Sequence, residues 1–284
     1  MPQTSDDGPA IYYETSGDAR GEPIVLIAGA SVQLIWWRDG FVQRLVDRGM
    51  FVIRLDNRDM GLSEKIGGPT DLAPTYGIPD MAGDVCRVLD ALGIVSAHIA
   101  GQSLGGGIAA AMAIHHAERV RSLVLFYTLP RLAPEYLTDE FQQLVQSPPS
   151  ADFSLSREEA IAGIVALARS TSSTDYAFDE AWIREYAERA YDRCFCPEGL
   201  VRQIGGALGS WNPSDADIGK LTMPTTMIHG RADRSLKAEA SIELGRLIPN
   251  SELHIYPGLG HELAEPLWDE FATIIARTIA RAPR

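Results

Sequence analysis

Short apolar runs alternate with amphipathic stretches along most of the chain. The apolar runs predict strands at residues 24–29, 51–55, 97–101, 122–127, 225–230 and 252–257. The amphipathic stretches predict helices at residues 41–47, 81–92, 104–115, 238–247 and 267–279. This alternation is typical of βα units, in which helices cover both faces of a mostly parallel sheet.

Two regions depart from the alternation. Residues 10–16, AIYYETS, have the pattern of an antiparallel edge strand that precedes the first βα unit. The middle of the chain has no strand pattern, and its helix-like segments are separated by loops rich in Pro, Ser, Asp and Gly. Because the alternation then resumes, we expect residues 1–129 and 215–284 to form one α/β core domain, with residues 130–214 inserted as a helical cap.

Composition and charge narrow the class of protein. The chain is 45% hydrophobic and 22% charged, as in a folded protein, and its net charge of -13 disfavours binding to nucleic acid or an anionic membrane. No apolar run is long enough to span a membrane, and no basic start leads into an apolar stretch, so we expect no secretory signal. The three cysteines, Cys86, Cys194 and Cys196, argue against a disulfide framework or a zinc site and fit a reducing, cytoplasmic location.

A candidate nucleophile lies between a predicted strand and a predicted helix. The segment Gly101-Gln102-Ser103-Leu104-Gly105 is a Gly-x-Ser-x-Gly turn, which lets a serine adopt a strained backbone with its hydroxyl raised above the sheet edge. The helix that begins there also presents free N–H groups and a positive dipole end to a developing oxyanion. A glycine-rich turn with a capping serine is the alternative, but the strand and helix on either side favour Ser103 as the nucleophile.

A serine nucleophile needs a base, and the chain has six histidines. His261 follows the turn-forming segment YPGLG after the last predicted strand. This places it at the carboxyl edge of the sheet, the same edge that carries Ser103. We therefore expect His261 to be the general base. Four of the others have structural explanations, within strands for His98 and His254 and at a helix end for His115 and His116. His229, at the end of a predicted strand, stays open as a base.

The base in turn needs a carboxylate that fixes its tautomer. Asp233 is the only acid in the loop IHGRADRSL after the preceding strand, and we expect it to orient His261; a solvated loop or helix-capping aspartate is the alternative. Glu262 adjoins His261 but is a weaker candidate, because it would point away from an imidazole that faces Ser103. The order Ser103, Asp233, His261 is the order of α/β-hydrolases.

Backbone donors and a substrate cleft complete the predicted site. The N–H of Leu104 is the first expected oxyanion donor, and the second comes from the loop after the first parallel strand, where Ala30 is our choice and Ser31 the near alternative. Trp36 and Trp37 follow in the same loop, and we expect a substrate-lining role for them, with core packing as the equal alternative.

The segments IVLIAGAS, RLDNRDMGLS, AGQSLGGGIAA, MPTTMIHGRADRSL and IYPGLGHEL stand in a characteristic order and spacing. On these segments the chain resembles the α/β-hydrolases over nearly its whole length. The resemblance implies the α/β class, with a mostly parallel central sheet, flanking helices and a helical cap inserted after strand 6. It also implies ester hydrolysis without a metal or an organic cofactor.

Within this family the chain is similar to esterases of the aclacinomycin methylesterase type, which often carry Arg-Asp-x-Gly-x-Ser, as in residues 58–63. We expect Arg58 and Asp59 to be structural, a turn with an ion pair. The segment Ala28-Gly29 departs from the family, in which many members have His-Gly, so the support of the oxyanion loop is left open.

The expected function is therefore hydrolysis of small-molecule carboxylic esters through an acyl-enzyme. Three alternatives stay open from the sequence. They are a cofactor-free haloperoxidase or perhydrolase that uses the same three residues, a hydrolase of carbon–carbon bonds, and a non-catalytic ligand-binding protein on the same fold.

Overall fold

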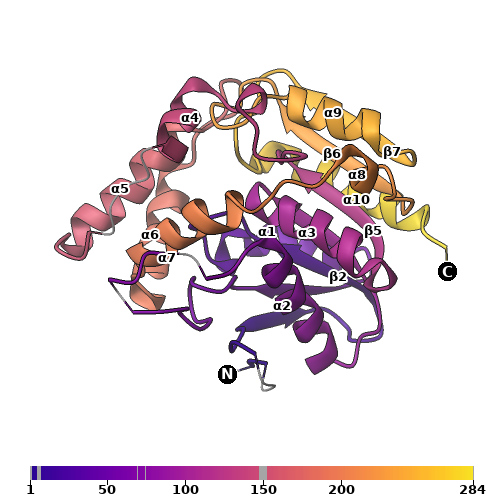
Figure 1. The fold of residues 1–284 in the computed structure, drawn as a ribbon, viewed down its shortest axis with the longest axis horizontal. Helices are drawn as coiled ribbons and strands as arrows, with labels where there is room; N and C mark the ends of the chain where they lie inside the picture. Colours follow the sequence, from indigo (N-terminus) through magenta and orange to yellow (C-terminus); the bar gives the residue numbers. More distant parts are fainter. Residues whose placement is uncertain (1, 5–7, 69, 74, 147–151, 284) are drawn as a thin grey trace.

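The computed structural model describes residues 2–4, 8–68, 70–73, 75–146 and 152–283. Within them, a seven-stranded sheet has the order β1-β3-β2-β4-β5-β6-β7 (Figure 1). The strands are β1 Tyr13–Ser16, β2 Glu22–Ile27, β3 Met50–Leu55, β4 Ala97–Gln102, β5 Val120–Phe126, β6 Thr225–Gly230 and β7 Ser251–Tyr256. Only the β1–β3 pair is antiparallel, so the predicted mostly parallel sheet with an antiparallel edge strand is confirmed.

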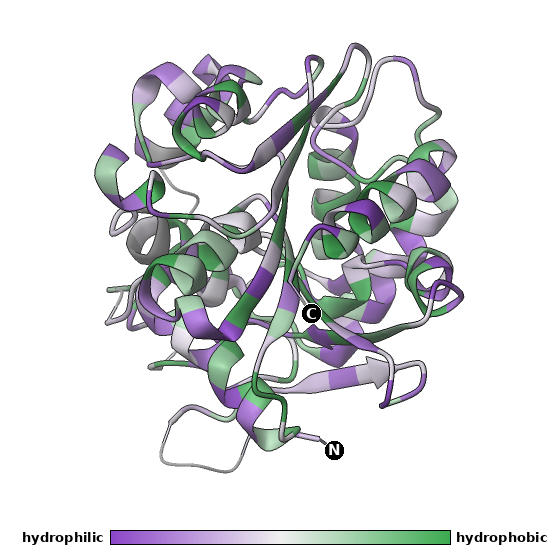
Figure 2. Cartoon of the chain, turned by 90° about the vertical axis from the view of Figure 1, so that its right-hand side faces the viewer, coloured by the Kyte–Doolittle hydropathy of each residue, from purple (hydrophilic) through white to green (hydrophobic). Residues whose placement is uncertain are grey.

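Helices cover both faces of the sheet, as Figure 2 shows from the side. The longer helices of this layer are α1 Asp39–Val46, α2 Ile78–Ala91, α3 Leu104–His115, α9 Glu239–Leu247 and α10 Trp268–Ala280. Short helical turns accompany them: η1 Leu34–Trp36, η2 Ala117–Arg119, α8 Asp215–Ile218 and η5 Glu265–Leu267. Helices α1 and α10 bury their apolar residues on one face, and α2, α3 and α9 bury theirs on the other. Because both faces are covered, every position of β3 and β4 is buried, which explains the continuous apolar runs in the sequence.

Between β5 and the start of α8 the described residues contribute one isolated bridge, Leu137 to Leu236, and otherwise loops and six helical segments. These are η3 Pro134–Tyr136, α4 Asp139–Gln146, α5 Arg157–Ser170, α6 Glu180–Arg193, α7 Pro197–Arg202 and η4 Gln203–Leu208. We call residues 130–214 the helical insertion; its helices α4 to α7 gather on one side of the sheet in Figure 1. The helical insertion follows the fifth strand, one strand earlier than expected. The count of six comes from the family resemblance, whereas the residue pattern predicts five strands before residue 130; the described chain before β1 contributes only an isolated bridge between Gln3 and Tyr12.

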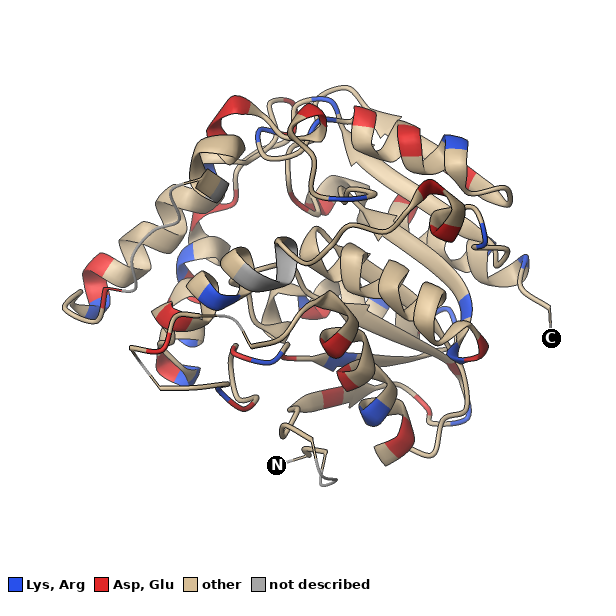
Figure 3. Cartoon of the chain, viewed as in Figure 1, with Lys and Arg blue, Asp and Glu red and all other residues tan. Residues whose placement is uncertain are grey.

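The helical insertion is attached to the core by apolar packing and by charge. Tyr186 and Ala190 of α6 pack against Leu34 and Ile35 of the core in one buried cluster. Ion pairs cross the same boundary, since Arg193 of α6 binds Asp56 at 2.6 Å and Arg38 binds Asp179 at 2.6 Å; exposed pairs such as Arg157 to Asp192 join α5 to α6. Figure 3 shows acidic and basic residues on the same helices, both here and on α9.

Helix α3 begins in close contact with the end of β2. A Cβ placed on Gly105 would lie 2.3 Å from the carbonyl oxygen of Ile27 and 2.6 Å from that of Ala28. Backbone atoms cannot move aside as a flexible side chain can, so only glycine permits this approach. The contact sets the height of the α3 N-terminus above the sheet.

We therefore expect Gly105→Ala to lower the free energy of unfolding by about 2–4 kcal/mol, because the added methyl forces α3 away from β2. The measurement is urea unfolding followed by circular dichroism. Gly163→Ala in α5 is the matched control, since outside its own helix no described heavy atom lies within 4 Å of the added Cβ. This control should be neutral or gain up to about 1 kcal/mol. Equal stability of the two variants would refute the close contact.

Candidate active site

Ser103 occupies the sharp turn between β4 and α3. Its φ is +51°, in the left-handed region, and a Cβ on Gly101 would lie 2.1 Å from the carbonyl oxygen of Gly105. The turn is held by the Ser103 N–H, which donates to the Phe126 carbonyl at 3.0 Å, and by the Thr128 hydroxyl, which donates to the Ser103 carbonyl at 2.7 Å. The Ser103 side chain is left half-buried at the carboxyl edge of the sheet.

Asp233 lies in the loop after β6, and its side chain is fully buried. Its Oδ1 accepts hydrogen bonds from the backbone N–H groups of Ser235 and Leu236 at 2.7 and 2.9 Å. Its Oδ2 lies 2.7 Å from His261 Nδ1. Burial alone would raise the pKa of Asp233, but the charge of His261 and the hydrogen bonds from His229 and His261 hold that pKa well below its usual value. The carboxylate is therefore ionised and fixed in orientation.

A second histidine shares the same carboxylate oxygen. His229 Nε2 is 3.3 Å from Asp233 Oδ2 and 3.1 Å from the Leu236 carbonyl, so this nitrogen carries the proton. Its Nδ1 then accepts the Ser241 hydroxyl at 2.7 Å. His229 is fully buried with both nitrogens engaged, which accounts for it as a structural support of Asp233. The sequence analysis left His229 open as a base at a strand end, and its contact with Asp233 could not be predicted because the two side chains meet only through the fold of the loop after β6.

His261 is held in the loop after β7. Its N–H donates to the Thr171 carbonyl of the helical insertion at 2.9 Å, and its ring centroid lies 4.5 Å from that of Tyr127. Since Nδ1 faces Asp233, Nε2 is the nitrogen left for a substrate or a nucleophile. No hydrogen bond joins His261 to Ser103 among the described residues. Tyr127 lies between the two, because its ring contacts His261 and the preceding residue, Phe126, accepts the Ser103 N–H.

Tyr127 and Glu262 have defined partners of their own. Tyr127 is fully buried, burial raises its pKa, and its hydroxyl donates to Gln102 Oε1 at 2.6 Å. It therefore supports both the serine turn and the His261 ring, a role that the sequence analysis missed. Glu262 accepts the Ser173 N–H at 2.7 Å, which turns its carboxylate toward the helical insertion and away from His261 Nδ1.

The loop after β2 runs past the serine. A Cβ on Gly29 would lie 3.4 Å from the Ser103 Cβ, so this loop is in van der Waals contact with the candidate nucleophile. Ser31 has a φ of +62°, and its N–H donates to Gln203 Oε1 at 3.1 Å. The N–H of Ala30 has no partner among the described residues. Ala30 is therefore the better placed of the two candidate donors, and Leu104 supplies the first N–H of α3 as expected.

The two tryptophans of the predicted substrate cleft differ in burial. Trp37 is fully buried in the core, with its ring centroid 5.8 Å from that of Phe41 and 6.0 Å from that of Phe126. It exposes no surface to a substrate, so the substrate-lining prediction for Trp37 is wrong. The apolar layer beneath α1 needs a large residue there, and a sequence pattern does not distinguish that need from a cleft.

Trp36 is partly exposed instead. Its ring packs on Tyr186 and Trp182 of the helical insertion, at centroid distances of 4.8 and 5.5 Å. It lines a pocket of about 560 Å³ between the start of α6 and the segment after His261. Neither Ser103 nor His261 is among the lining residues, so a substrate-binding role for Trp36 stays a prediction.

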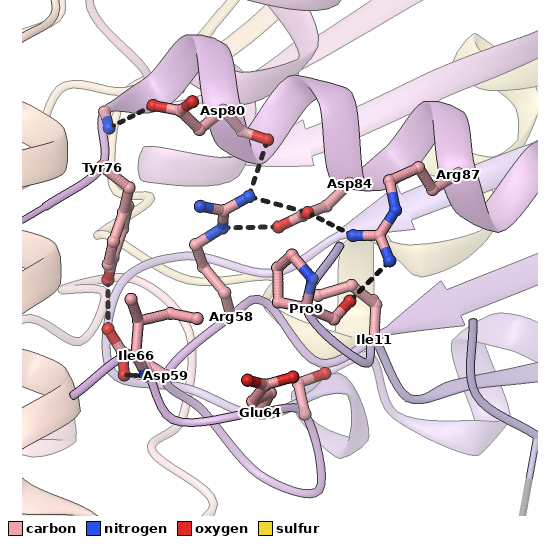
Figure 4. A network of polar contacts seen from close by, with 12 residues as sticks. Pro9, Ile11, Arg58, Asp59, Glu64, Ile66, Tyr76, Asp80, Asp84 and Arg87 are labelled. Carbon is pink, nitrogen blue, oxygen red and sulfur yellow. Dashed lines mark hydrogen bonds and ion pairs between the residues drawn. The ribbon is translucent and has the colours of Figure 1, made fainter. Parts of the chain in front are cut away.

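Arg58 and Asp59 each pair with a different partner. Arg58 binds the buried Asp84 through two hydrogen bonds of 2.6 and 2.7 Å (Figure 4). Asp59 accepts two hydrogen bonds, of 2.9 and 2.7 Å, from Arg202 of the helical insertion and one of 2.6 Å from the Tyr76 hydroxyl. This loop is thus a structural junction. The turn therefore forms two ion pairs, each with a residue outside it: Arg58 with Asp84 and Asp59 with Arg202.

Across the described ranges, no group of three or more His, Cys, Asp or Glu side chains is arranged to hold a metal ion. No helix in the described part of the chain has both the length and the apolar character needed to cross a membrane.

The chain belongs to the α/β-hydrolase family, because the model of the alpha/beta hydrolase fold matches residues 22–265. It is 33% identical over 197 residues to a 2-hydroxymuconate semialdehyde hydrolase of Pseudomonas putida, covering 69% of this chain and 66% of that protein. It is 38% identical over 122 residues to the rhodomycin D methylesterase DnrP of Streptomyces peucetius, covering 43% of this chain and 40% of that protein. The chain thus spans less than two thirds of either relative.

A solved structure extends the likeness to the whole fold. The esterase RhEst1 of Rhodococcus sp. ECU1013 superposes with a TM-score of 0.78 at 22% identity, covering 99% of this chain and 98% of that chain. At this identity the likeness concerns the fold alone. The predicted α/β-hydrolase fold and the resemblance to methylesterases are both confirmed, and the family is one of hydrolases.

The pairing of Asp233 with His261 predicts a dependence of stability on pH. The pKa of Asp233 is lowered in the folded protein from an ordinary 3.8, so its stabilising effect is complete above that value and is lost as the pH falls through the folded pKa. Asp233→Asn should therefore reduce the free energy of unfolding at pH values above about 4, with a difference from wild type that narrows as the pH falls below that value. Urea unfolding of both proteins over this range measures the difference. A difference that widens in acid would contradict the assignment.

Proposed function

We propose that this protein is a serine hydrolase that cleaves carboxylic esters of small molecules through an acyl-enzyme, without a metal or an organic cofactor. The observation that carries the proposal is the hydrogen bond of 2.7 Å between Asp233 and His261 Nδ1. It leaves Nε2 as the nitrogen of His261 that does not face the acid, in a loop at the same sheet edge as Ser103. The similarity to a rhodomycin D methylesterase supports an ester as the substrate.

In this mechanism Ser103 attacks the ester carbonyl while His261 takes the hydroxyl proton. The buried Asp233 stabilises the imidazolium that forms. The N–H groups of Ala30 and Leu104 bind the oxyanion of the tetrahedral intermediate. His261 then protonates the leaving alcohol, and a water molecule activated by the same histidine releases the acid and restores Ser103.

The distribution of burial suits these roles. Asp233 is fully buried, whereas the His261 side chain is 16% exposed. The acid is therefore kept from water, and the base can still exchange a proton with a substrate or a water molecule. This division of burial is what a base that must act twice in each turnover requires.

We expect Ser103→Ala to lower the turnover of p-nitrophenyl and methyl esters by about 10⁴- to 10⁶-fold, because the three residues act as a unit. The melting temperature should stay close to that of the wild type. Labelling with a fluorophosphonate, located by peptide mass spectrometry, should modify Ser103 in the wild type. Ser154→Ala, at an exposed serine, is the control and should keep full activity and labelling. Full ester turnover by Ser103→Ala would refute the proposal.

A second candidate function rests on the hydrolase of 2-hydroxymuconate semialdehyde that is 33% identical to this chain. The same three residues would then serve a substrate other than an ester. A panel of graded esters assayed beside that semialdehyde distinguishes the two, because the preferred substrate shows the higher kcat/KM. Bromination in acetate with peroxide detects a perhydrolase, and failure of the fluorophosphonate to react identifies a non-catalytic binding protein.

A further inference from the structure

Gln203 connects the helical insertion to two loops of the core. It stands at the start of η4 and is fully buried. Its Oε1 accepts the Ser31 N–H at 3.1 Å, and its Nε2 donates to the Arg58 carbonyl at 2.9 Å. Both ends of the side-chain amide are therefore used, each on a backbone group more than 140 residues away in sequence.

The bond to Ser31 acts next to a candidate oxyanion donor. Ser31 is held at a φ of +62°, which a residue with a side chain adopts only when its surroundings enforce it. On the other side of Ala30, Asn57 donates to the Ala28 carbonyl at 3.0 Å. The backbone is thus fixed both before and after Ala30, and the N–H of Ala30 is the group left free to turn toward Ser103.

Gln203 is itself held in place by its neighbour. Arg202 and Asp59 form an ion pair in which both side chains are fully buried. Arg202 also donates to the carbonyls of Gly68 and Asp71, at 3.2 and 2.9 Å. A buried ion pair in which every guanidinium nitrogen has a partner permits little displacement, since moving either side chain exposes an unpaired charge to the protein interior. The position of the Gln203 amide is correspondingly fixed.

We propose that Gln203 is a positioning residue for the oxyanion hole. By taking up the Ser31 N–H, it holds the loop so that the Ala30 N–H faces the oxyanion, and the hole is complete only while the helical insertion is docked. This inference rests on the proposed serine hydrolase function. A donor that is displaced by about 1 Å loses much of its effect on a transition state, so a residue that never touches the substrate controls turnover here.

The chain offers a matched control for a merely structural role. Gln33 is also buried, at 2% exposure, and also joins this loop to the helical insertion, through Nε2 to the Ala190 carbonyl at 2.8 Å. Its side chain makes no hydrogen bond to Ser31 among those of the described residues. Gln33→Met and Gln203→Met therefore remove similar contacts between core and helical insertion, but only the second releases the Ser31 N–H.

The experiment compares two inhibitors of matched shape. The Ser103 hydroxyl adds to the carbonyl of a trifluoromethyl ketone and gives a hemiketal oxyanion. The corresponding alcohol has no carbonyl, so it binds without forming an oxyanion. For Gln203→Met we expect the affinity for the ketone, relative to the alcohol, to fall by about 10- to 100-fold. The kcat for p-nitrophenyl acetate should fall by a similar factor with little change in KM. For Gln33→Met the ketone-to-alcohol affinity ratio and the kcat should both stay near the wild-type values. This should hold even if its melting temperature falls as far as that of Gln203→Met.

Active sites are counted by titration with a fluorophosphonate, so that misfolded protein does not enter the rates. If Gln203→Met does not fold, Gln203→Asn replaces it, because the shorter side chain keeps the amide but withdraws it from Ser31; the same loss is expected. Unchanged ketone selectivity in the folded variant, or an equal loss in Gln33→Met, would overturn the inference. If wild-type protein neither cleaves esters nor binds the ketone through Ser103, the proposed function itself fails, and this outcome is distinct from the other two.

Discussion

The backbone at Ser103 is the constraint on which the rest of the site depends. A left-handed conformation at a residue with a side chain costs about 1–3 kcal/mol, and it persists only where surrounding contacts enforce it. Here the Phe126 carbonyl and the Thr128 hydroxyl bind the two sides of the turn, and Gly101 and Gly105 allow strand and helix to meet. The loop after β2, the Tyr127 ring and the α3 N-terminus all take their places from this turn.

Much of the fold and the order of the site residues could be predicted from the sequence, because their signals are local. The buried strands appear as continuous apolar runs, and α3 was expected at residues 104–115, where it is found. The serine turn and the loops of Asp233 and His261 each follow a strand, so their common edge of the sheet follows from parallel topology alone.

What the sequence did not reveal are contacts between distant segments. Gln203 and Arg202 lie in a helical region whose periodicity says nothing about partners in the core, and the position of His229 near a strand end does not show which carboxylate it contacts. Trp37 was placed in the cleft because a tryptophan in a loop is compatible with either a pocket or a core. The loop that begins with Ala28-Gly29 is held by Asn57 and Gln203, which bind its backbone at Ala28 and Ser31 and come from distant parts of the chain.

The helical insertion reaches both sides of the candidate site. Its residues 171–173 bind the loop of His261, through the Thr171 carbonyl and the Ser173 hydroxyl and N–H, while Gln203 binds the loop of Ala30. This bridging limits how such a protein can diversify. A helical segment taken from a relative could reshape the space above Ser103, but it would fit a new compound at the expense of turnover unless it also carried groups that engage both loops. Recombination between family members is therefore expected to succeed where the junctions leave these two short stretches with the core that they contact.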